Sequence, residues 1–199
     1  MDKFIFGITG ATGAGKSTVS KLFRDLGVYV ADADKASRAV TQKGSQCLSE
    51  ICNKFGSNVI TKTGEFDRKA LGKIVFNDKE KLQLLNNITH KYIKSYLENE
   101  IANSTSPIVA IDGAVIIGSP VMDMCKLMVV VIADTATRIE RITKRDNIDK
   151  KTAQMRVASQ MTNEEYCQYA DYIIENNDEI NLGECVEKIY NKIENISKK

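Results

Sequence analysis

The chain has 199 residues, of which 43% are hydrophobic and 27% are charged, and its formal net charge is +2. This composition is typical of globular proteins and excludes the disordered and fibrous classes. The length favours one main core with a smaller appended lobe. The net charge gives no indication of a nucleic-acid or membrane partner, because such partners usually require a clustered basic face.

The sequence shows no targeting or membrane-spanning segment. The first residues, MDKFIFGITG, lack the long apolar stretch of a secretory signal, and the longest apolar run, Leu127 to Ala133, is far shorter than a membrane span. The cysteines form no CxxC pair and no metal-binding spacing with histidine. They are Cys47, Cys52, Cys125, Cys167 and Cys185. We therefore expect reduced, partly buried thiols in a cytoplasmic protein.

Short apolar runs rich in β-branched residues recur along the chain and are separated by stretches of helical character. This alternation predicts an α/β fold, in which a doubly wound, five-stranded parallel sheet has helices on both faces. Ligands of such folds gather at the carboxyl ends of the strands. The predicted strands are Lys3–Thr9, Val28–Ala31, Ile108–Asp112, Leu127–Ala133 and Tyr172–Glu175.

A glycine-rich motif follows the first predicted strand and opens a helical pattern that runs to Leu26. Its sequence, GATGAGKS, fits GxxxxGK[ST]. Glycines allow backbone N–H groups to turn inward around an anion, and the N-terminus of the next helix adds its positive end. A glycine-rich turn without a nucleotide is the alternative. The predicted phosphate-binding residues are Gly10, Ala11, Thr12, Gly13, Ala14, Gly15, Lys16, Ser17 and Thr18.

Within this P-loop, each polar side chain has an expected task. Lys16 should reach the β and γ oxygens of a nucleotide, and the Ser17 hydroxyl should ligate magnesium. Thr18 is counted with the loop, although an ordinary helix residue is the simpler interpretation. The motif therefore predicts ATP and Mg²⁺ as cofactors and phosphoryl transfer as the chemistry.

Acidic residues follow two of the predicted strands. Asp32 and Asp34 come at the end of the second strand, where one of them would orient or deprotonate an acceptor hydroxyl. Helix capping and solvent contact are the alternative for this pair. Asp112 has the place of a Walker-B-like carboxylate that holds magnesium directly or through water, and it is also a candidate for substrate contact. A turn aspartate is the alternative there.

The connection between the second and third strands is much longer than a simple crossover. It spans roughly 75 residues, whereas a βαβ crossover needs only about a dozen. Apolar residues at three- and four-residue steps from Leu82 to Ile101 predict a helix, and a second helix is expected near Ser45–Phe55. We expect residues 41–104 to form a small helical lobe that covers a substrate.

Three arginines follow the fourth predicted strand at helical spacing. Arg138, Arg141 and Arg145 are expected to share one helix face that points toward the crevice or into solvent. An arginine supplied by a closing segment would neutralise charge on the transferred phosphoryl group, so residues 138–160 are the predicted lid. A solvated helix face is the alternative. His90, among helical apolar residues, has the pattern of a packed or surface histidine.

Other residues match a pattern spread along most of the chain. They are Asp32-Ala33-Asp34 after the second strand, then Phe55-Gly56, Gly64, Arg68, Leu71, Phe76 and His90, then Arg141, Arg145 and Asp146 after the fourth strand, and finally Gln160, Ala170, Asp171 and Asn176. In this pattern the sequence resembles the dephospho-coenzyme A kinase family.

The resemblance implies a fold of the P-loop nucleoside and nucleotide kinase type, and transfer of phosphate from ATP to the ribose 3′-hydroxyl of dephospho-coenzyme A. It implies that Asp32 is the catalytic base, assisted by Lys16 and Arg141. Arg141 and Arg145 would close over the phosphates, and the Asn176 region would lie near adenine. The helical insert would bind the pantetheine end. The substrate-side candidates are Asp34, Arg68, His90 and Asp112. The small-molecule substrate is the expected partner of a monomer or weak homo-oligomer.

The sequence departs from the family pattern at two places. The family usually has Pro-Leu-Leu followed by a hydrophobic residue and Glu where this chain reads Ala114-Val-Ile-Ile-Gly118, and Lys91 follows His90 where proline is common. The missing carboxylate bears on acceptor choice or turnover rather than on ATP binding. Two alternatives stay open: a kinase of another nucleoside, nucleotide or small alcohol, and a nucleotide-binding regulatory paralogue with weak transfer.

Overall fold

The computed structural model describes residues 3–114, 116–177 and 180–198. Val115, in the segment that departs from the family pattern, lies outside the described residues. The chain divides into two compact units. The first contains the residues up to Asp32 and from Ser104 onward, and the second contains Ala33–Asn103.

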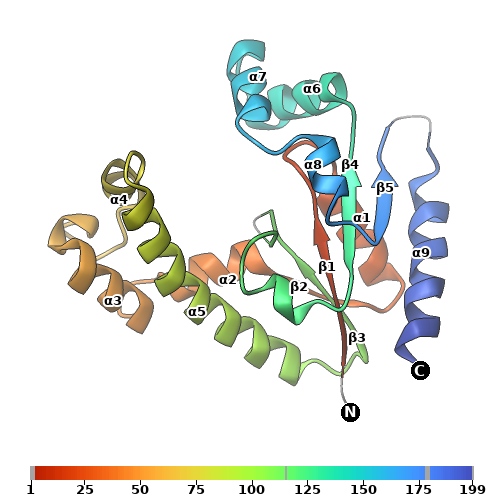
Figure 1. Ribbon diagram of the computed structural model, residues 1–199, viewed down its shortest axis with the longest axis horizontal. Coiled ribbons are helices and arrows are strands. Elements are labelled where there is room, and N and C mark those ends of the chain that lie inside the picture. The colour runs from red at the N-terminus through yellow and green to blue at the C-terminus, as the bar shows by residue number, and fades with distance from the viewer. Residues whose placement is uncertain (1–2, 115, 178–179, 199) are drawn as a thin grey trace. The chain divides into compact units, whose positions relative to one another are not determined.

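The first unit is built on a five-stranded sheet in which all paired strands are parallel (Figure 1). The strand order is β2-β3-β1-β4-β5. Each strand lies within one residue of its predicted run, so the predicted parallel sheet is confirmed. The strands are β1 (Phe4–Thr9), β2 (Tyr29–Asp32), β3 (Ile108–Asp112), β4 (Met128–Ile132) and β5 (Tyr172–Glu175).

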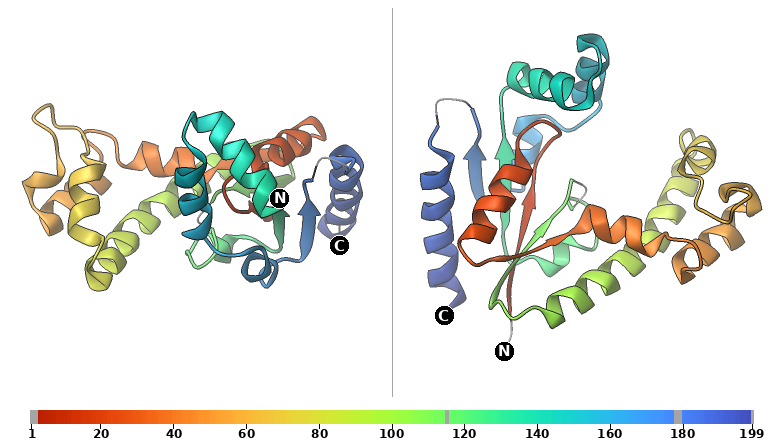
Figure 2. Two further views of the ribbon diagram at one scale, coloured as in Figure 1. Left: turned by 90° about the horizontal axis from the view of Figure 1, so that it is seen from above. Right: turned by 180° about the vertical axis from the view of Figure 1, so that it is seen from behind.

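Helices cover both faces of this sheet (Figure 2). Val129 and Val131 of β4 belong to the core shared with α1 (Lys16–Asp25) and α9 (Leu182–Ser197), whereas Val130 between them packs with Tyr166 of α8 (Asn163–Cys167). Because side chains alternate along a strand, α8 lies on the opposite face from α1 and α9. The doubly wound prediction is therefore confirmed. The remaining helical elements of this unit are η2 (Met122–Met124), α6 (Thr135–Asp146) and α7 (Lys150–Ala158).

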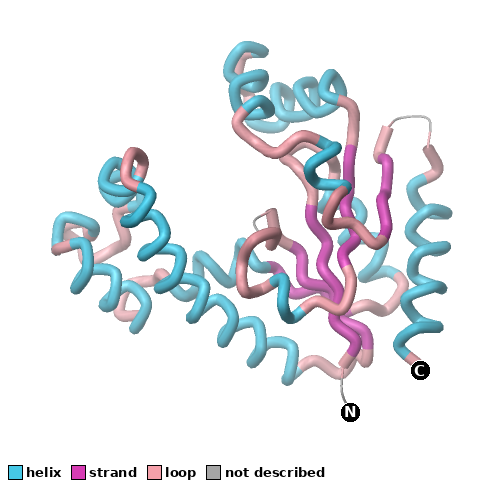
Figure 3. Tube along the Cα trace, viewed as in Figure 1, coloured by secondary structure: helices cyan, strands magenta, loops and turns pink. Residues whose placement is uncertain are grey.

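The second unit consists of helices around its own small core (Figure 3). It begins at Ala33 rather than at the predicted Thr41, because the helix that starts there packs against the long helix of the same unit. Buried apolar residues such as Ile51, Val59 and Leu71 form its core. Its elements are α2 (Ala33–Val40), α3 (Gln46–Phe55), η1 (Ser57–Val59), α4 (Arg68–Val75) and α5 (Lys79–Asn103).

All five cysteines are free thiols. Burial raises the pKa of Cys47 to about 11, with Glu50 adding to the effect, and burial raises the pKa of Cys125 to about 12. Both thiols are therefore protonated at neutral pH and are weak nucleophiles. In the part of the chain that the structure describes, no helix combines the length and apolar composition needed to cross a bilayer.

Candidate active site

The phosphate loop connects the end of β1 to the start of α1, as the motif predicts. Gly13 and Gly15 have φ values of 84° and 88°, in the left-handed region. A Cβ atom at Gly13 would lie 2.8 Å from the carbonyl oxygen of Arg138, and one at Gly15 would overlap Nδ2 of Asn176. Glycine is therefore required at both positions by conformation and by space.

Three consecutive carbonyl groups of this loop bond to side chains from other elements of the first unit. These contacts run from Arg138 Nε to Thr12 O at 3.1 Å, from Arg141 Nη1 to Gly13 O at 3.5 Å, and from Asn176 Nδ2 to Ala14 O at 2.8 Å. Buried carbonyl groups need such partners. The three side chains thus hold the outer side of the loop.

Several backbone N–H groups of the loop are available to bind a ligand. No partner among the described residues accepts a hydrogen bond from the N–H groups of Gly13, Gly15, Lys16 or Ser17. Successive N–H groups in this conformation, followed by a helix N-terminus, form an anion-binding site. The arrangement is chemically suited to the phosphates of a nucleotide.

Lys16 and Asp112 form an ion pair beside the loop. The other carboxylate oxygen of Asp112 accepts a hydrogen bond of 2.8 Å from Ser20 Oγ, which is buried. Sequence analysis missed Ser20, although its position four residues after Lys16 on one helix face is a usable signal. Asp112 is the last residue of β3, where strand geometry rather than a free turn fixes its position.

Asp32 is brought next to Asp112 by the sheet register. It is the last residue of β2, it is half-buried, and it pairs directly with Asp112 of β3. The two carboxylates therefore lie at the carboxyl edge of the sheet, with Asp112 on β3, the neighbour of β1, and Asp32 one strand further out on β2. Asp34 falls in the first turn of α2, where the helix dipole favours an acidic side chain, and it belongs to the second unit.

The three arginines of α6 have different surroundings. Arg138 is only 2% exposed and is packed against the phosphate loop, so the alternative of a solvated side chain is wrong for this residue. Arg141 also donates to the carbonyl oxygen of Asn176 at 3.0 Å. One side of α6 faces solvent along the helix, with Thr135, Glu140 and Arg145 exposed, whereas the side that carries Arg138 packs against the loop.

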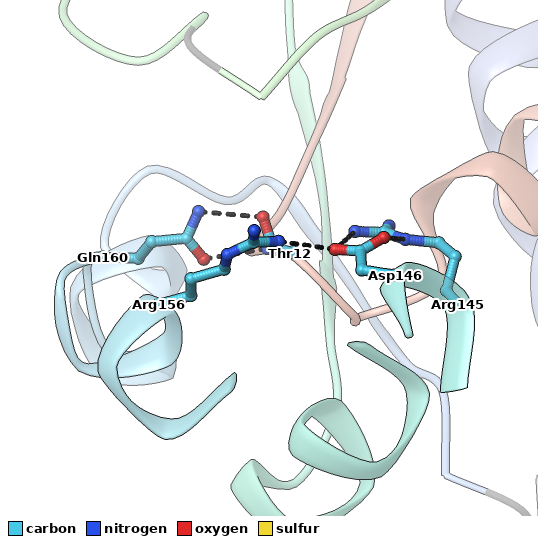
Figure 4. Close-up of polar contacts among 5 residues, drawn as sticks. All are labelled: Thr12, Arg145, Asp146, Arg156 and Gln160. Atoms are coloured by element: carbon cyan, nitrogen blue, oxygen red, sulfur yellow. Dashed lines mark hydrogen bonds and ion pairs between the residues drawn. The ribbon is translucent and has the colours of Figure 1, made fainter. Parts of the chain in front are cut away.

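Arg145, at the end of α6, forms an ion pair with the neighbouring Asp146 (Figure 4). Its guanidinium bonds to Asp146 at 2.8 and 3.1 Å, and Arg156 of α7 reaches the same carboxylate at 2.6 Å. The hydrogen bond from Arg145 lowers the pKa of Asp146 below its usual value. The structure therefore brings Arg141, but not Arg145, to the phosphate loop.

The other substrate-side candidates lie in the second unit. Arg68, the first residue of α4, donates a hydrogen bond of 2.7 Å to Thr41 Oγ1, and its guanidinium lies 5.0 Å from the ring centre of Phe66. His90 is half-buried in α5, and burial lowers its pKa, so it is neutral at pH 7. Arg68 is thus fixed in place by a hydrogen bond and an aromatic contact.

Gly118 stands where the family pattern has glutamate. Its φ of 73° lies in the left-handed region, although the space that a Cβ atom would occupy is open. A glutamate would therefore be strained by the backbone rather than by its neighbours. In this chain the loss of the carboxylate accompanies a turn that favours glycine.

Comparison with known proteins identifies the family. The family model for dephospho-CoA kinase matches residues 4–181. The dephospho-CoA kinase of Mannheimia succiniciproducens is 37% identical over 176 residues, which cover 88% of this chain and 82% of the relative. That of Fusobacterium nucleatum is 36% identical over 189 residues, which cover 95% of this chain and 96% of the relative.

Solved structures agree with this result. A crystal structure of a Thermus thermophilus protein superposes with a TM-score of 0.81 at 26% identity and covers 97% of each chain. The dephospho-CoA kinase from Campylobacter jejuni has a TM-score of 0.64 at 26% identity, with 95% of this chain and 96% of that chain covered. A shikimate kinase from Acinetobacter baumannii, at 17% identity and a TM-score of 0.53, shares the fold alone. The chain belongs to the dephospho-CoA kinase family.

Proposed function

We propose that this protein transfers the γ-phosphoryl group of ATP to the ribose 3′-hydroxyl of dephospho-CoA, giving CoA and ADP. The observation that carries the proposal is the phosphate loop, whose carbonyl groups are held from outside while its N–H groups stay available, beside Asp32 and Asp112. Family membership supports the choice of acceptor. The 3′-oxygen forms the new P–O bond, the bond to ADP breaks, and the hydroxyl proton passes to Asp32.

The nucleotide would be positioned mainly by the backbone. Inward N–H groups of the loop would bind the phosphates, and Lys16 would exchange its contact with Asp112 for the β and γ oxygens. Asn176, which already holds the outer side of the loop, would lie near adenine. Arg145 would have to leave Asp146 to reach the phosphates, so its role requires movement within the segment 138–160, the proposed lid.

The side chains beside the loop suit a magnesium ion that arrives with ATP. The exposed Ser17 hydroxyl and the carboxylate of Asp112 are hard oxygen donors, and Mg²⁺ is usually held by one or two such groups together with substrate phosphates. Among the described residues no cluster of three or more His, Cys, Asp or Glu forms a resident metal site. When bound, Mg²⁺ neutralises charge on the phosphate oxygens.

The roles on the acceptor side follow the family resemblance. Asp32 would orient and deprotonate its 3′-hydroxyl, while Asp34, Arg68 and His90 would contact the substrate, with the pantetheine end held by the helical insert. The free thiols support a reducing compartment, and we propose the cytoplasm. A monomer or weak homo-oligomer completes the proposal.

Arg141→Ala is expected to lower kcat by roughly 10²-fold, the scale for losing one pre-positioned charged donor. ATP affinity should fall by a smaller factor, because Arg141 also contacts the carbonyl oxygens of Gly13 and Asn176. Initial rates at saturating substrates and direct ATP titration separate the two effects. Arg24→Ala, on the exposed surface of α1, is the control. Equal losses of kcat and affinity would mean that Arg141 only binds ground-state ATP.

The proposed function is tested by measuring ADP release from ATP with dephospho-CoA present and absent. Adenosine, AMP and a small alcohol are offered as competing acceptors, and the position of the new phosphate is read by NMR. We expect rapid release only with dephospho-CoA. Faster transfer to another acceptor would indicate a different kinase, and ATP binding without transfer would indicate a regulatory protein.

A further inference from the structure

Thr12, in the middle of the phosphate loop, has all of its hydrogen-bonding groups engaged by two side chains. Its N–H donates to Gln160 Oε1 at 3.0 Å, and its hydroxyl accepts from Gln160 Nε2 at 3.0 Å. Its carbonyl oxygen accepts from Arg138 Nε at 3.1 Å, and Arg138 Nη2 also reaches Gln160 Oε1 at 3.3 Å. Figure 4 shows the pair formed by Gln160 and Thr12. We call these three residues the Thr12 clamp.

The charge in this clamp is unusual. Arg138 is buried, and its hydrogen-bond acceptors are the neutral oxygens of Thr12 and Gln160. None of the carboxylates in the described ranges forms an ion pair with it. A buried guanidinium stays charged but loses hydration, so it normally requires an anionic partner. Its charge here lies directly behind the loop that would receive a polyanion.

The clamp also connects the two ends of one segment. Arg138 belongs to the first turn of α6, and Gln160 follows α7. Both ends of the segment between them therefore contact the same residue, Thr12. Thr12 is adjacent to Gly13, whose N–H is among the available donors of the loop. The amide of Gln160 fits its partner in one orientation, in which the oxygen faces the N–H and the nitrogen faces the hydroxyl.

We propose that Arg138 and Gln160 are positioning residues for phosphoryl transfer, which act through Thr12 to hold the phosphate loop in the conformation that receives ATP. The proposal rests on the proposed function for its reaction, but its direct consequence is ATP affinity. A shift in the loop would move several N–H donors together, so losing the clamp should weaken ATP binding more than acceptor binding.

The first experiment is a double-mutant cycle on Thr12 and Gln160. ATP binding is titrated directly without acceptor, and KM is determined for ATP and for acceptor. We expect Gln160→Met to raise Kd and KM for ATP about tenfold, in keeping with the loss of hydrogen bonds to the half-buried Thr12. Thr12→Val should have a smaller effect, and the double variant should match Gln160→Met, because both substitutions remove the same contact. KM for the acceptor should change less than twofold.

Two variants control the interpretation. Gln160→Glu keeps an oxygen for the Thr12 N–H and should retain most of the ATP affinity. Gln168→Met makes the same kind of change at the exposed end of α8, outside the clamp and the proposed lid, and should behave as wild type. Loss of ATP affinity in Gln168→Met equal to that in Gln160→Met would overturn the proposal, since the effect would then not depend on Thr12.

The second experiment tests the buried arginine. Arg138→Met preserves much of the side-chain volume, and we expect ATP affinity to fall at least tenfold while the thermal midpoint without ATP changes little. A lowered midpoint with unchanged ATP affinity in both Arg138→Met and Gln160→Met would overturn the proposal, as would additive effects in the Thr12 cycle. If Arg138→Met does not fold, the double-mutant cycle on Thr12 and Gln160 decides whether the proposal holds. Wild-type protein that binds ATP without phosphorylating dephospho-CoA would contradict the proposed function and leave this test intact.

Discussion

Replacing Lys16 with alanine is expected to lower kcat by roughly 10³-fold, the upper scale for removing one pre-positioned charge from a reacting group. The β and γ oxygens lose a cation that backbone amides do not replace. ATP affinity should fall as well, because the ion pair with Asp112 is lost and that carboxylate then faces the phosphates. ADP release at saturating dephospho-CoA measures the first effect, and ATP titration measures the second.

The structure offers two controls for this variant. Lys21→Ala removes an exposed lysine from the same helix and should leave turnover unchanged. Lys16→Ala combined with Asp112→Asn should bind ATP more tightly than Lys16→Ala alone, because the unpaired negative charge is gone. Near-normal turnover of Lys16→Ala would remove the loop lysine from the mechanism.

Asp32→Asn is expected to lower kcat by roughly 10²-fold or more, the usual scale for losing a general base. The substitution keeps the shape of the side chain at the end of β2, next to Asp112, and removes only its capacity to take a proton. Affinities for ATP and dephospho-CoA should therefore stay close to wild type. Single-turnover transfer measures the chemical step, and direct titration of each substrate measures binding.

Asp34→Asn should be milder, because Asp34 lies in the first turn of α2 rather than on the sheet edge. Asp25→Asn, at the exposed end of α1, controls for the loss of one negative charge. Normal turnover of Asp32→Asn together with an inactive Asp34→Asn would reverse the two assignments. Activity in both variants would place the base elsewhere.

Elements specified by local sequence were predictable. The strands read as short apolar runs, and the glycine and lysine spacing of residues 10–17 indicated the loop between β1 and α1. The helices α2 and α4 were not predicted, because each has only eight residues and depends on packing within the second unit. Periodicity is a weak signal over so short a span.

The support of the loop was less predictable than the loop itself. Gln160 matched the family pattern, but no sequence rule indicated that it bonds to Thr12, 148 positions away. Helical spacing grouped Arg138 with Arg141 and Arg145, yet spacing gives a shared face without saying what covers it. In the structure the loop covers Arg138, whereas Arg145 is exposed.

The outward carbonyl bonds of the phosphate loop also bear on how the protein folds. Their donors, Arg138, Arg141 and Asn176, follow β4 and β5, more than 120 residues along the chain from the loop, with separations of 126, 128 and 162. Contacts of such high sequence separation form late because long loops must close first. A nascent chain therefore contains the whole GxxxxGKS motif long before it can hold a nucleotide. We therefore expect the loop to bind ATP only once β5 has joined the sheet, and bound ATP to stabilise the completed sheet relative to partly folded precursors.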